Sequence, residues 1–328
     1  EKINKNSLRD QLINKAIKFH LKGNILEATK YYKYCILQGI TDPRIFSNYG
    51  AIIQSEGKLI EAEKLYGKAI EIDPNFANAY SNLGNVLIEL GKSKEAEKLY
   101  RKAIELNPDF ANAHSNLGNV LRDLGKLKEA EVSYLKAIEL NPDFTEAHSN
   151  LGNILSDLGK LKEAEVSYLK AIELNPDFAI AHDNLGTIFK NQGKTKKAEL
   201  YYRKAIEIDP DFANAYSNLG SLLTDLGQMQ DAEFSFRKAI EIDPDLANVH
   251  SNLGNIQRNQ GKTLEAELSF RKAIEINPNF AIAHSNLGNI YKDQGKTKEA
   301  ELSYLKAIKI DPDFAIAHSN LGTIFRSQ

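Results

Sequence analysis

Proline recurs along this chain of 328 residues at a constant interval of 34 residues, and this period constrains the fold more than any other feature. The series is Pro74, Pro108, Pro142, Pro176, Pro210, Pro244, Pro278 and Pro312. Two glycine series, which start at Gly50 and Gly57, keep the same interval. A fixed period of this length is typical of repeat architectures, in which each unit contacts only its neighbours. Such a chain can exceed the ~250–300 residues at which a single globular core stops growing.

One repeat, residues 111–144, predicts two helices. Small and apolar residues first recur at steps of three and four, at Ala113, Leu117, Val120, Leu121 and Leu124. This spacing predicts an amphipathic helix, and Gly125 then stands where a helix often ends. A second such pattern follows at Leu127, Ala130, Tyr134, Ala137 and Ile138, and it stops at the turn sequence Asn141-Pro142-Asp143. Each repeat is therefore predicted to be a pair of antiparallel helices.

A glycine inside the first helix of each repeat needs a packing reason. Gly118 costs about 1 kcal/mol of helix stability relative to alanine. We expect another helix backbone to approach closely there, with Ala130 and Ala137 facing the same junction.

The repeat combines Leu-Gly in its first helix, Gly-Lys at the turn, Glu-Ala and Tyr-x-x-Ala in its second helix, and a following proline. This pattern resembles the tetratricopeptide repeat (TPR) family. The resemblance implies an all-α fold, an α-solenoid of antiparallel helical hairpins wound into a right-handed superhelix. It divides the chain into N-terminal helices of a degenerate first repeat (1–42), eight repeats of 34 residues (43–314) and the first helix of an incomplete repeat (315–328). The unpaired last helix and the start at Glu1 lead us to expect a longer natural chain.

The amino-acid composition excludes some classes of binding partner. The 42 Lys and Arg nearly balance the 44 Asp and Glu, which argues against a nucleic-acid surface. No apolar stretch is long enough to span a membrane. The single cysteine, Cys35, cannot form an intramolecular disulfide, and this fits a reducing, cytoplasmic setting. We expect its thiol to be buried and structural.

Neither metal nor catalytic chemistry is indicated. Six histidines share one repeat position, where neighbouring repeats should lie ~10 Å apart, whereas zinc ligands lie ~2 Å from the ion. They are His114, His148, His182, His250, His284 and His318, with Tyr80 and Tyr216 at the same position elsewhere, and we expect packed rings there. Four Glu–Arg pairs at i,i+4 (Glu97–Arg101, Glu199–Arg203, Glu233–Arg237 and Glu267–Arg271) indicate a solvated helix face. We therefore expect no enzyme, no cofactor and no metal.

An asparagine precedes each Leu-Gly pair or its equivalent, and we call this series the asparagine ladder. It comprises Asn48, Asn82, Asn116, Asn150, Asn184, Asn218, Asn252, Asn286 and Asn320. A second amide row lies three residues later, at Asn85, Asn119, Asn153, Asn255 and Asn289, with Thr187, Ser221 and Thr323 in other repeats. An amide side chain both donates and accepts, so it can pair with the peptide groups of any sequence. The ladder resembles the one that holds the substrate backbone in the TPR region of O-GlcNAc transferases. The alternative is that these amides bond across the helix junction and stabilise the stack, and both roles can coexist.

The resulting prediction is a non-catalytic scaffold that binds a protein or an extended peptide in a concave groove. The resemblance places Asn112, Glu146, Ile180, Ile282 and Ile316 in that groove, and it predicts no clamp for carboxylates because Ser81, Ser115 and Ser149 stand where Lys or Arg would be needed. Val132 with Leu135, Val166 with Leu169, and Leu302 with Leu305 should form an apolar strip on the convex side. Self-association through that strip or through the open C-terminal end is a further candidate. The alternatives are a substrate-recruiting arm of a larger glycosyltransferase or sulfotransferase, and a self-assembling structural array.

Overall fold

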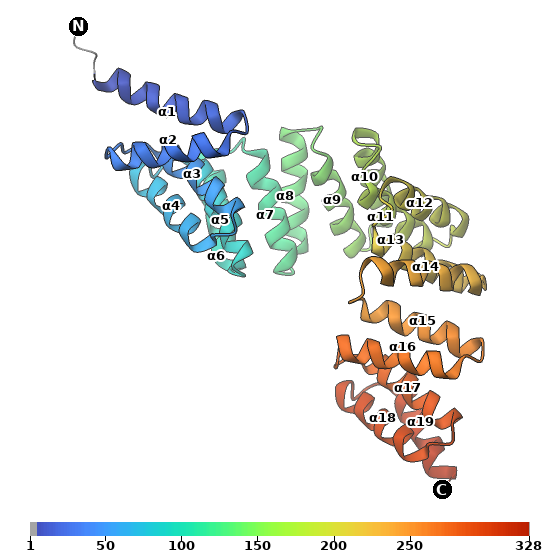
Figure 1. Cartoon of the computed structure of the whole chain (residues 1–328). Coiled ribbons are helices and arrows are strands. Elements are labelled where there is room, and N and C mark those ends of the chain that lie inside the picture. Colours follow the sequence, from blue (N-terminus) through green and yellow to red (C-terminus); the bar gives the residue numbers. More distant parts are fainter. Residues whose placement is uncertain (1–4, 328) are drawn as a thin grey trace. The chain divides into compact units, whose positions relative to one another are not determined.

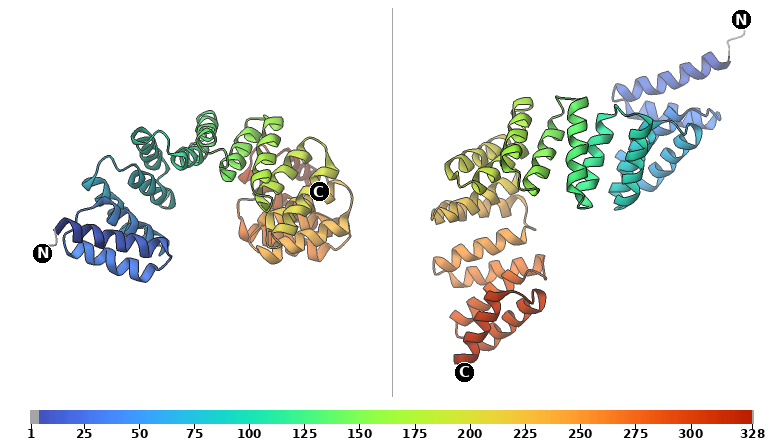
Figure 2. Two further views of the ribbon diagram at one scale, coloured as in Figure 1. Left: turned by 90° about the horizontal axis from the view of Figure 1, so that it is seen from above. Right: turned by 180° about the vertical axis from the view of Figure 1, so that it is seen from behind.

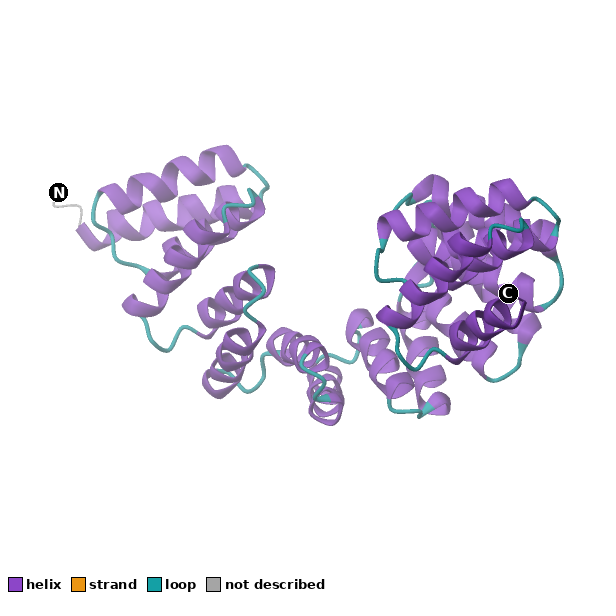
Figure 3. Ribbon diagram, turned by 90° about the horizontal axis from the view of Figure 1, so that it is seen from below, coloured by secondary structure: helices purple, strands orange, loops and turns teal. Residues whose placement is uncertain are grey.

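A computed structural model describes residues 5–327, and this part of the chain forms nineteen α-helices and no strand (Figures 1 and 3). The chain divides into two compact units, Glu1–Leu174 and Asn175–Gln328. The helices of unit 1 are α1 (Lys5–Leu21), α2 (Ile25–Leu37), α3 (Pro43–Ser55), α4 (Leu59–Ile72), α5 (Ala77–Glu89), α6 (Ser93–Leu106), α7 (Ala111–Asp123), α8 (Leu127–Leu140), α9 (Thr145–Asp157) and α10 (Leu161–Leu174). Those of unit 2 are α11 (Ala179–Asn191), α12 (Thr195–Ile208), α13 (Ala213–Asp225), α14 (Met229–Ile242), α15 (Ala247–Asn259), α16 (Thr263–Ile276), α17 (Ala281–Asp293), α18 (Thr297–Ile310) and α19 (Ala315–Ser327).

Each odd-numbered helix from α1 to α17 packs along the even-numbered helix that follows it, and the two form a hairpin (Figure 2). We call the odd-numbered member the first helix and the even-numbered member the second helix. Each second helix then packs against the first helix of the next hairpin within its unit. This arrangement confirms the prediction of an all-α solenoid built from helical hairpins.

Glycine forms the turn inside each hairpin. Gly125 has a φ of 73°, a backbone conformation that other residues rarely adopt. Its N–H donates to the Arg122 carbonyl at 2.9 Å, and the Lys126 N–H donates to the Leu121 carbonyl at 2.7 Å. These bonds satisfy carbonyl groups that the end of α7 would otherwise leave unpaired. The predicted helix end at Gly125 is therefore confirmed.

The atoms nearest to the glycine inside the first helix belong to an aromatic ring, which the sequence did not assign to this contact. At Gly186 the expected backbone approach is also present, since the Ala198 carbonyl oxygen lies 3.3 Å from an added Cβ. A Cβ placed on Gly118 would lie 2.8 Å from the ring of Tyr134 in α8. Tyr134 is fully buried, as are Ala130 and Ala137 beside it. The small residues therefore make room for a large ring, which fills the space between the two helices at close to crystal-like density.

The first helices lie on the inner side of each unit. Those of neighbouring hairpins contact one another directly, for example α5 with α7 in unit 1 and α15 with α17 in unit 2. Among the described helices, no two second helices are in comparable contact. Neighbouring first helices therefore lie closer together than neighbouring second helices do, and each unit curves around the first-helix side.

Cys35 is fully buried in the hydrophobic core around α2, and burial raises the pKa of its thiol. This environment confirms the prediction of a structural cysteine, because the protonated thiol is a weak nucleophile.

Candidate functional site

The asparagine ladder lies on the first helices, and every member is half-buried. Asn116 illustrates the position, since it stands between Ser115 and Leu117, which are both buried. The ladder amides therefore lie at the border between the packed interior and the surface. We call the surface formed by the ladder and the second amide row the first-helix face.

A hydrogen-bonded relay connects the two rows in several repeats. The Tyr134 hydroxyl donates to Oδ1 of Asn119 at 2.6 Å, and Nδ2 of Asn150 in the next repeat donates to the same oxygen at 3.2 Å. The ring that packs on the glycine thus also anchors the second amide row. Equivalent tyrosine bonds link Tyr100 to Asn85, Tyr168 to Asn153 and Tyr304 to Asn289, and equivalent amide bonds link Asn116 to Asn85 and Asn320 to Asn289.

These bonds are the junction contacts that the sequence left as an alternative to ligand binding. They run within one hairpin, through the tyrosine, and on to the next repeat, through the ladder amide. Burial raises the pKa of Tyr304 to about 12, so its hydroxyl is protonated and donates at neutral pH. The ladder therefore contributes to the stack in these repeats, whatever else it binds.

Three amides of unit 2 stand outside this relay. Asn252, Asn255 and Asn286 make no side-chain hydrogen bond within the part of the chain that the structure describes, although they occupy the same two positions. The rings at the tyrosine position are here Phe236 and Phe270, which carry no hydroxyl. The variation at the ring therefore coincides with the loss of internal bonds in the rows.

Asp183 is a buried carboxylate that the sequence reasoning missed. It is 5 % exposed, and both of its oxygens accept from Nδ2 of Asn218 at 3.0 Å. Burial raises the pKa of Asp183 to about 6, although the bond from Asn218 acts in the opposite direction. A signal was present, because the same position holds serine in the other repeats, at Ser47, Ser81, Ser115, Ser149, Ser217, Ser251, Ser285 and Ser319.

The residues that follow the first residue of each repeat are exposed beside the ladder. Asn112 and Glu146 are exposed in unit 1, and Ile180, Ile282 and Ile316 are about half exposed in unit 2. These side chains are accessible to a ligand that lies along the first helices.

The repeated histidines bond to the turn before their own helix. Nε2 of His148 lies 2.9 Å from the carbonyl oxygen of Pro142, and the other five make the same contact at 2.8–3.0 Å. The Tyr80 hydroxyl replaces this bond with one to Pro74 at 3.2 Å. The ring is therefore structural, as predicted, but it acts through a hydrogen bond to the turn as well as through packing. Within residues 5–327, no three His, Cys, Asp or Glu side chains are arranged to hold a metal ion.

The second helices present a different surface, with exposed apolar side chains. Val132, Val166 and Leu302 are each about two-thirds exposed, and Leu135, Leu169 and Leu305 are about half exposed. Leu200, Phe234 and Leu268 occupy the same helix position as Val132 and are also exposed. The four predicted Glu–Arg pairs are present on these helices at 2.6–3.0 Å.

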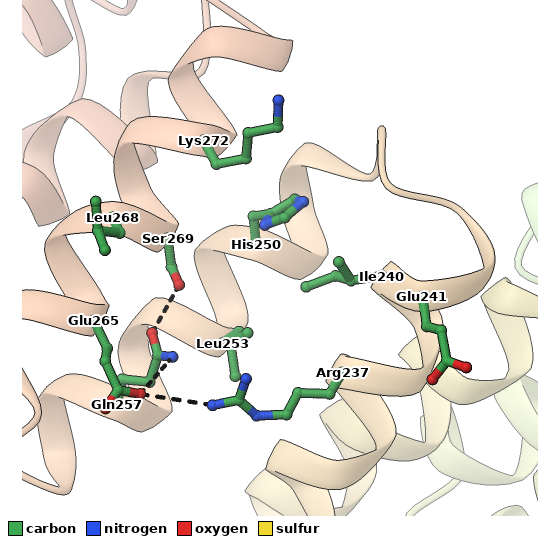
Figure 4. Close-up of a pocket in the computed structure, with 10 residues that line it drawn as sticks. All are labelled: Arg237, Ile240, Glu241, His250, Leu253, Gln257, Glu265, Leu268, Ser269 and Lys272. Atoms are coloured by element: carbon green, nitrogen blue, oxygen red, sulfur yellow. Dashed lines mark hydrogen bonds and ion pairs between the residues drawn. The ribbon is translucent and has the colours of Figure 1, made fainter.

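A hollow of about 520 Å³ on this second surface is lined by residues of α14, α15 and α16, which Figure 4 shows in close-up. Its polar groups bond to one another: the Ser269 hydroxyl donates to Gln257 at 2.7 Å, and Arg237 lies 3.6 Å from Glu265. Leu268 and Leu253 supply apolar contacts at its wall. Ser269 and His250 both line this hollow, but the Ser269 hydroxyl bonds to Gln257 and Nε2 of His250 lies 2.9 Å from the Pro244 carbonyl oxygen.

None of the described helices is both long and apolar enough to cross a membrane.

Comparisons with known proteins identify the repeat. Models described as TPR repeat match residues 50–91, 84–121, 118–159, 186–227 and 288–328. Models described as tetratricopeptide repeat match residues 145–178, 211–279, 167–199 and 269–301. No curated protein matches the chain.

One solved structure supports the fold, and a second is similar over a shorter length. The chain is similar to one in the crystal structure of the APC/C hetero-tetramer Cut9-Hcn1, with a TM-score of 0.66 and 18 % identity over 91 % of this chain. It covers 59 % of that chain's length. YrrB, a TPR protein with an unusual peptide-binding site, matches 57 % of this chain and 96 % of its own at 28 % identity and a TM-score of 0.46. With family models matched over more than half of its length, this chain belongs to the tetratricopeptide repeat family.

Proposed function

We propose that this protein is a non-catalytic scaffold that binds an extended segment of a partner protein along its first-helix face. Tetratricopeptide repeat proteins generally mediate protein–protein interactions. The observation that carries the proposal is the position of the ladder, since a half-buried amide recurs in mid-helix in every repeat. Asparagine is a poor helix former, so its recurrence there calls for a role beyond helix stability.

The spacing of the ladder suits an extended ligand. Neighbouring first helices lie about one helix diameter apart, ~10 Å, and an extended chain advances ~3.3–3.6 Å per residue. Each ladder amide would meet about every third residue of the ligand. Because peptide groups are the same in every sequence, these contacts tolerate many ligand sequences. The arrangement resembles the ladder in the TPR region of O-GlcNAc transferases, and it would serve equally in a substrate-recruiting arm.

The asparagine ladder and the second amide row consist of uncharged side chains. We therefore expect the affinity for a peptide to depend little on salt concentration. No Lys or Arg belongs to the ladder or to the second amide row. A peptide affinity that changed steeply between 50 mM and 500 mM salt would indicate ion pairing, which screening weakens, and would contradict this part of the proposal.

The proposal is tested with a library of random 12-residue peptides displayed on phage. Peptides selected by the wild-type chain are labelled with fluorescein, and their dissociation constants are measured by anisotropy. A blocking variant carries Asn112→Arg and Asn248→Arg, which place long charged side chains at exposed positions of the first-helix face. A control variant carries Val132→Arg and Leu268→Arg on the exposed surface of the second helices.

We expect the blocking variant to bind at least about 10-fold more weakly and the control variant to bind like wild type. The opposite result would move the binding site to the second helices. Self-association through the exposed apolar side chains of the second helices is a separate prediction. A sedimentation coefficient that stays constant with protein concentration would exclude it.

A further inference from the structure

The aromatic ring that packs on the first-helix glycine lacks its hydroxyl in two consecutive repeats. Phe236 packs on Gly220 and Phe270 on Gly254, at 2.7 and 2.8 Å from an added Cβ. Tyr134 packs on Gly118 at 2.8 Å, so the rings occupy equivalent places. The substitution therefore leaves the packing unchanged and removes one hydrogen-bond donor.

The tyrosine hydroxyl determines whether the oxygen atoms of the second amide row remain available to a ligand. Oδ1 of Asn119 accepts from the Tyr134 hydroxyl and from Asn150, and Oδ1 of Asn289 accepts from Tyr304 and Asn320. An amide oxygen has two lone pairs, and both are occupied in these repeats. Such an asparagine can still donate to a ligand, but its oxygen cannot accept from one without breaking an internal bond.

Asn255 has the same neighbours without the hydroxyl. The ring beneath it is Phe270, and the following ladder residue, Asn286, makes no bond to it. At Asn119 and Asn289 the tyrosine bond and the bond from the next ladder amide occur together, whereas Asn255 has neither within the described chain. Asn252 follows Ser221, which has no amide oxygen to accept its bond, so Asn252, Asn255 and Asn286 all keep their donors and acceptors.

Two of these free amides, Asn252 and Asn255, line a hollow on the first-helix face. Ser221, Asn252 and Asn255 line a space of about 180 Å³, together with Thr224, Asp225 and Phe236. This volume is below the ~300–1,000 Å³ that is typical of a small-molecule pocket. It suits a local contact with a chain that continues beyond the hollow on both sides.

We propose that Asn252, Asn255 and Asn286 form the point at which the main chain of a bound peptide is held most tightly. Here the row amide as well as the ladder amides keeps an oxygen for a peptide N–H and an Nδ2 for a peptide C=O, whereas the row oxygens of Asn119 and Asn289 are occupied. This inference rests on the proposed function and specifies where on the first-helix face the affinity is concentrated. The tyrosine hydroxyls then act as specificity-determining groups, since they engage the second amide row internally in the other repeats.

The test exchanges the hydroxyl between the two kinds of repeat. Phe270→Tyr restores the donor beside Asn255, and Tyr134→Phe removes it beside Asn119. The new hydroxyl has a place to fit, because Tyr304 stands in the same relation to Asn289. Asn255→Ala and Asn119→Ala form the matched pair that removes each row amide. Circular dichroism and thermal melting of all four variants verify that they fold.

The probe is the fluorescein-labelled peptide that the wild-type chain selects from the random library. We expect Phe270→Tyr and Asn255→Ala each to weaken binding about 2- to 10-fold, the change that one net hydrogen bond produces. Tyr134→Phe should leave the affinity the same or raise it, and Asn119→Ala should change it less than about 2-fold. N-methylation of each peptide bond in turn should identify one position that weakens binding to wild type but not to Asn255→Ala.

The outcomes separate the two proposals. Phe270→Tyr binding as tightly as wild type, or more tightly, would overturn the inference, because it would mean that the relay orients amides for the ligand instead of occupying them. If the blocking variant loses binding while Asn255→Ala and Phe270→Tyr do not, the first-helix face binds peptide and this location is wrong. If the blocking variant retains full affinity, the proposed function itself fails.

Discussion

The first-helix faces of the two units are built on the same frame but differ in their polar groups. In unit 1 the position before the ladder is always serine, and tyrosine hydroxyls anchor Asn85, Asn119 and Asn153. In unit 2 that position includes Asp183, and two of the anchoring rings are phenylalanine. The buried alanines and the glycine under each ring are the same in both units. The comparison shows that the polar groups can change while the packing is kept, because the ring position can lose its hydroxyl without losing its contact with the glycine.

The largest expected difference concerns the carboxylate of Asp183. The pKa of Asp183 in the folded state, about 6, lies above the usual value of 3.8, so the folded chain binds this proton more tightly than the unfolded chain does. The contribution of Asp183 to stability is therefore most favourable below about pH 4 and is lost as the pH rises through about 6. Asp183→Ser should raise the free energy of unfolding by up to about 3 kcal/mol at pH 8 and by almost nothing at pH 4. Denaturant midpoints at the two pH values measure this.

The matched control places the same carboxylate in unit 1. Ser115 is buried at the equivalent position, so Ser115→Asp should destabilise the chain at pH 8 more than at pH 4. Equal pH dependence in the wild type and in Asp183→Ser would show that this buried carboxylate does not differ from an exposed one.

The next effect concerns ligand binding by the two units. The triple variant Asn252→Ala, Asn255→Ala and Asn286→Ala should bind the selected peptide roughly 30-fold more weakly, about 2 kcal/mol. The corresponding triple variant of unit 1 removes amides that already have internal bonds, and it should lose no more than about 3-fold. It carries changes at Asn116, Asn119 and Asn150. Fluorescence anisotropy with one peptide compares the two. Equal losses would mean that the whole ladder contributes uniformly.

Because a glycine packs against a buried ring in the same way in both units, we expect the same substitution to change the free energy of unfolding equally in both. Gly118→Ala and Gly254→Ala each place a methyl group 2.8 Å from a buried ring, and each should lower the free energy of unfolding by about 1–2 kcal/mol. Gly322→Ala is the control, since no atom lies within 4 Å of its added Cβ, and it should gain up to about 1 kcal/mol from helix propensity. Chemical denaturation of the three variants measures these changes in the free energy of unfolding. A large difference between Gly118→Ala and Gly254→Ala would disprove a common core.

The smallest effect is the contribution of the hydroxyl to stability. Tyr134→Phe leaves the ring in place and removes the bond to Asn119, so it should cost about 1 kcal/mol. Phe270→Tyr should stabilise the chain by the same amount or less. Thermal melting of the two variants shows whether each one loses or gains stability. Destabilisation by Phe270→Tyr would show that Asn255 does not accept the new bond.

Sequence alone predicted the elements that depend on local patterns. The helix end at Gly125 and the buried Ala130 and Ala137 follow from periodicity and from the backbone preference of glycine, which act within one or two turns of chain. The partner of Gly118 could not be predicted correctly, because a small residue indicates that something approaches but not what approaches. The ring of Tyr134 was recognised as a core residue without being assigned to that contact.

The hydrogen-bonded relay between the two amide rows could not be predicted from the sequence, for a different reason. It joins Asn119, Tyr134 and Asn150, and its bonds depend on side-chain directions that a 34-residue period does not fix. Sequence did contain a trace of it, since Ser221 replaces asparagine where Phe236 replaces tyrosine. The role of the ladder in binding a peptide stays a prediction until the variants above are measured.

The contact between the glycine and its ring also bears on how such a protein changes over evolution. Gly118 and Tyr134 lie 16 residues apart in one hairpin, so a duplicated repeat carries its own core contact with it. Residues 111–144 and 145–178 differ at only four positions, which is the trace that a recent copying event leaves. If the first-helix face binds an extended chain as proposed, each added copy would lengthen that face by ~10 Å, about three residues of the chain. Recombination would then change the length of the bound segment without redesigning the fold.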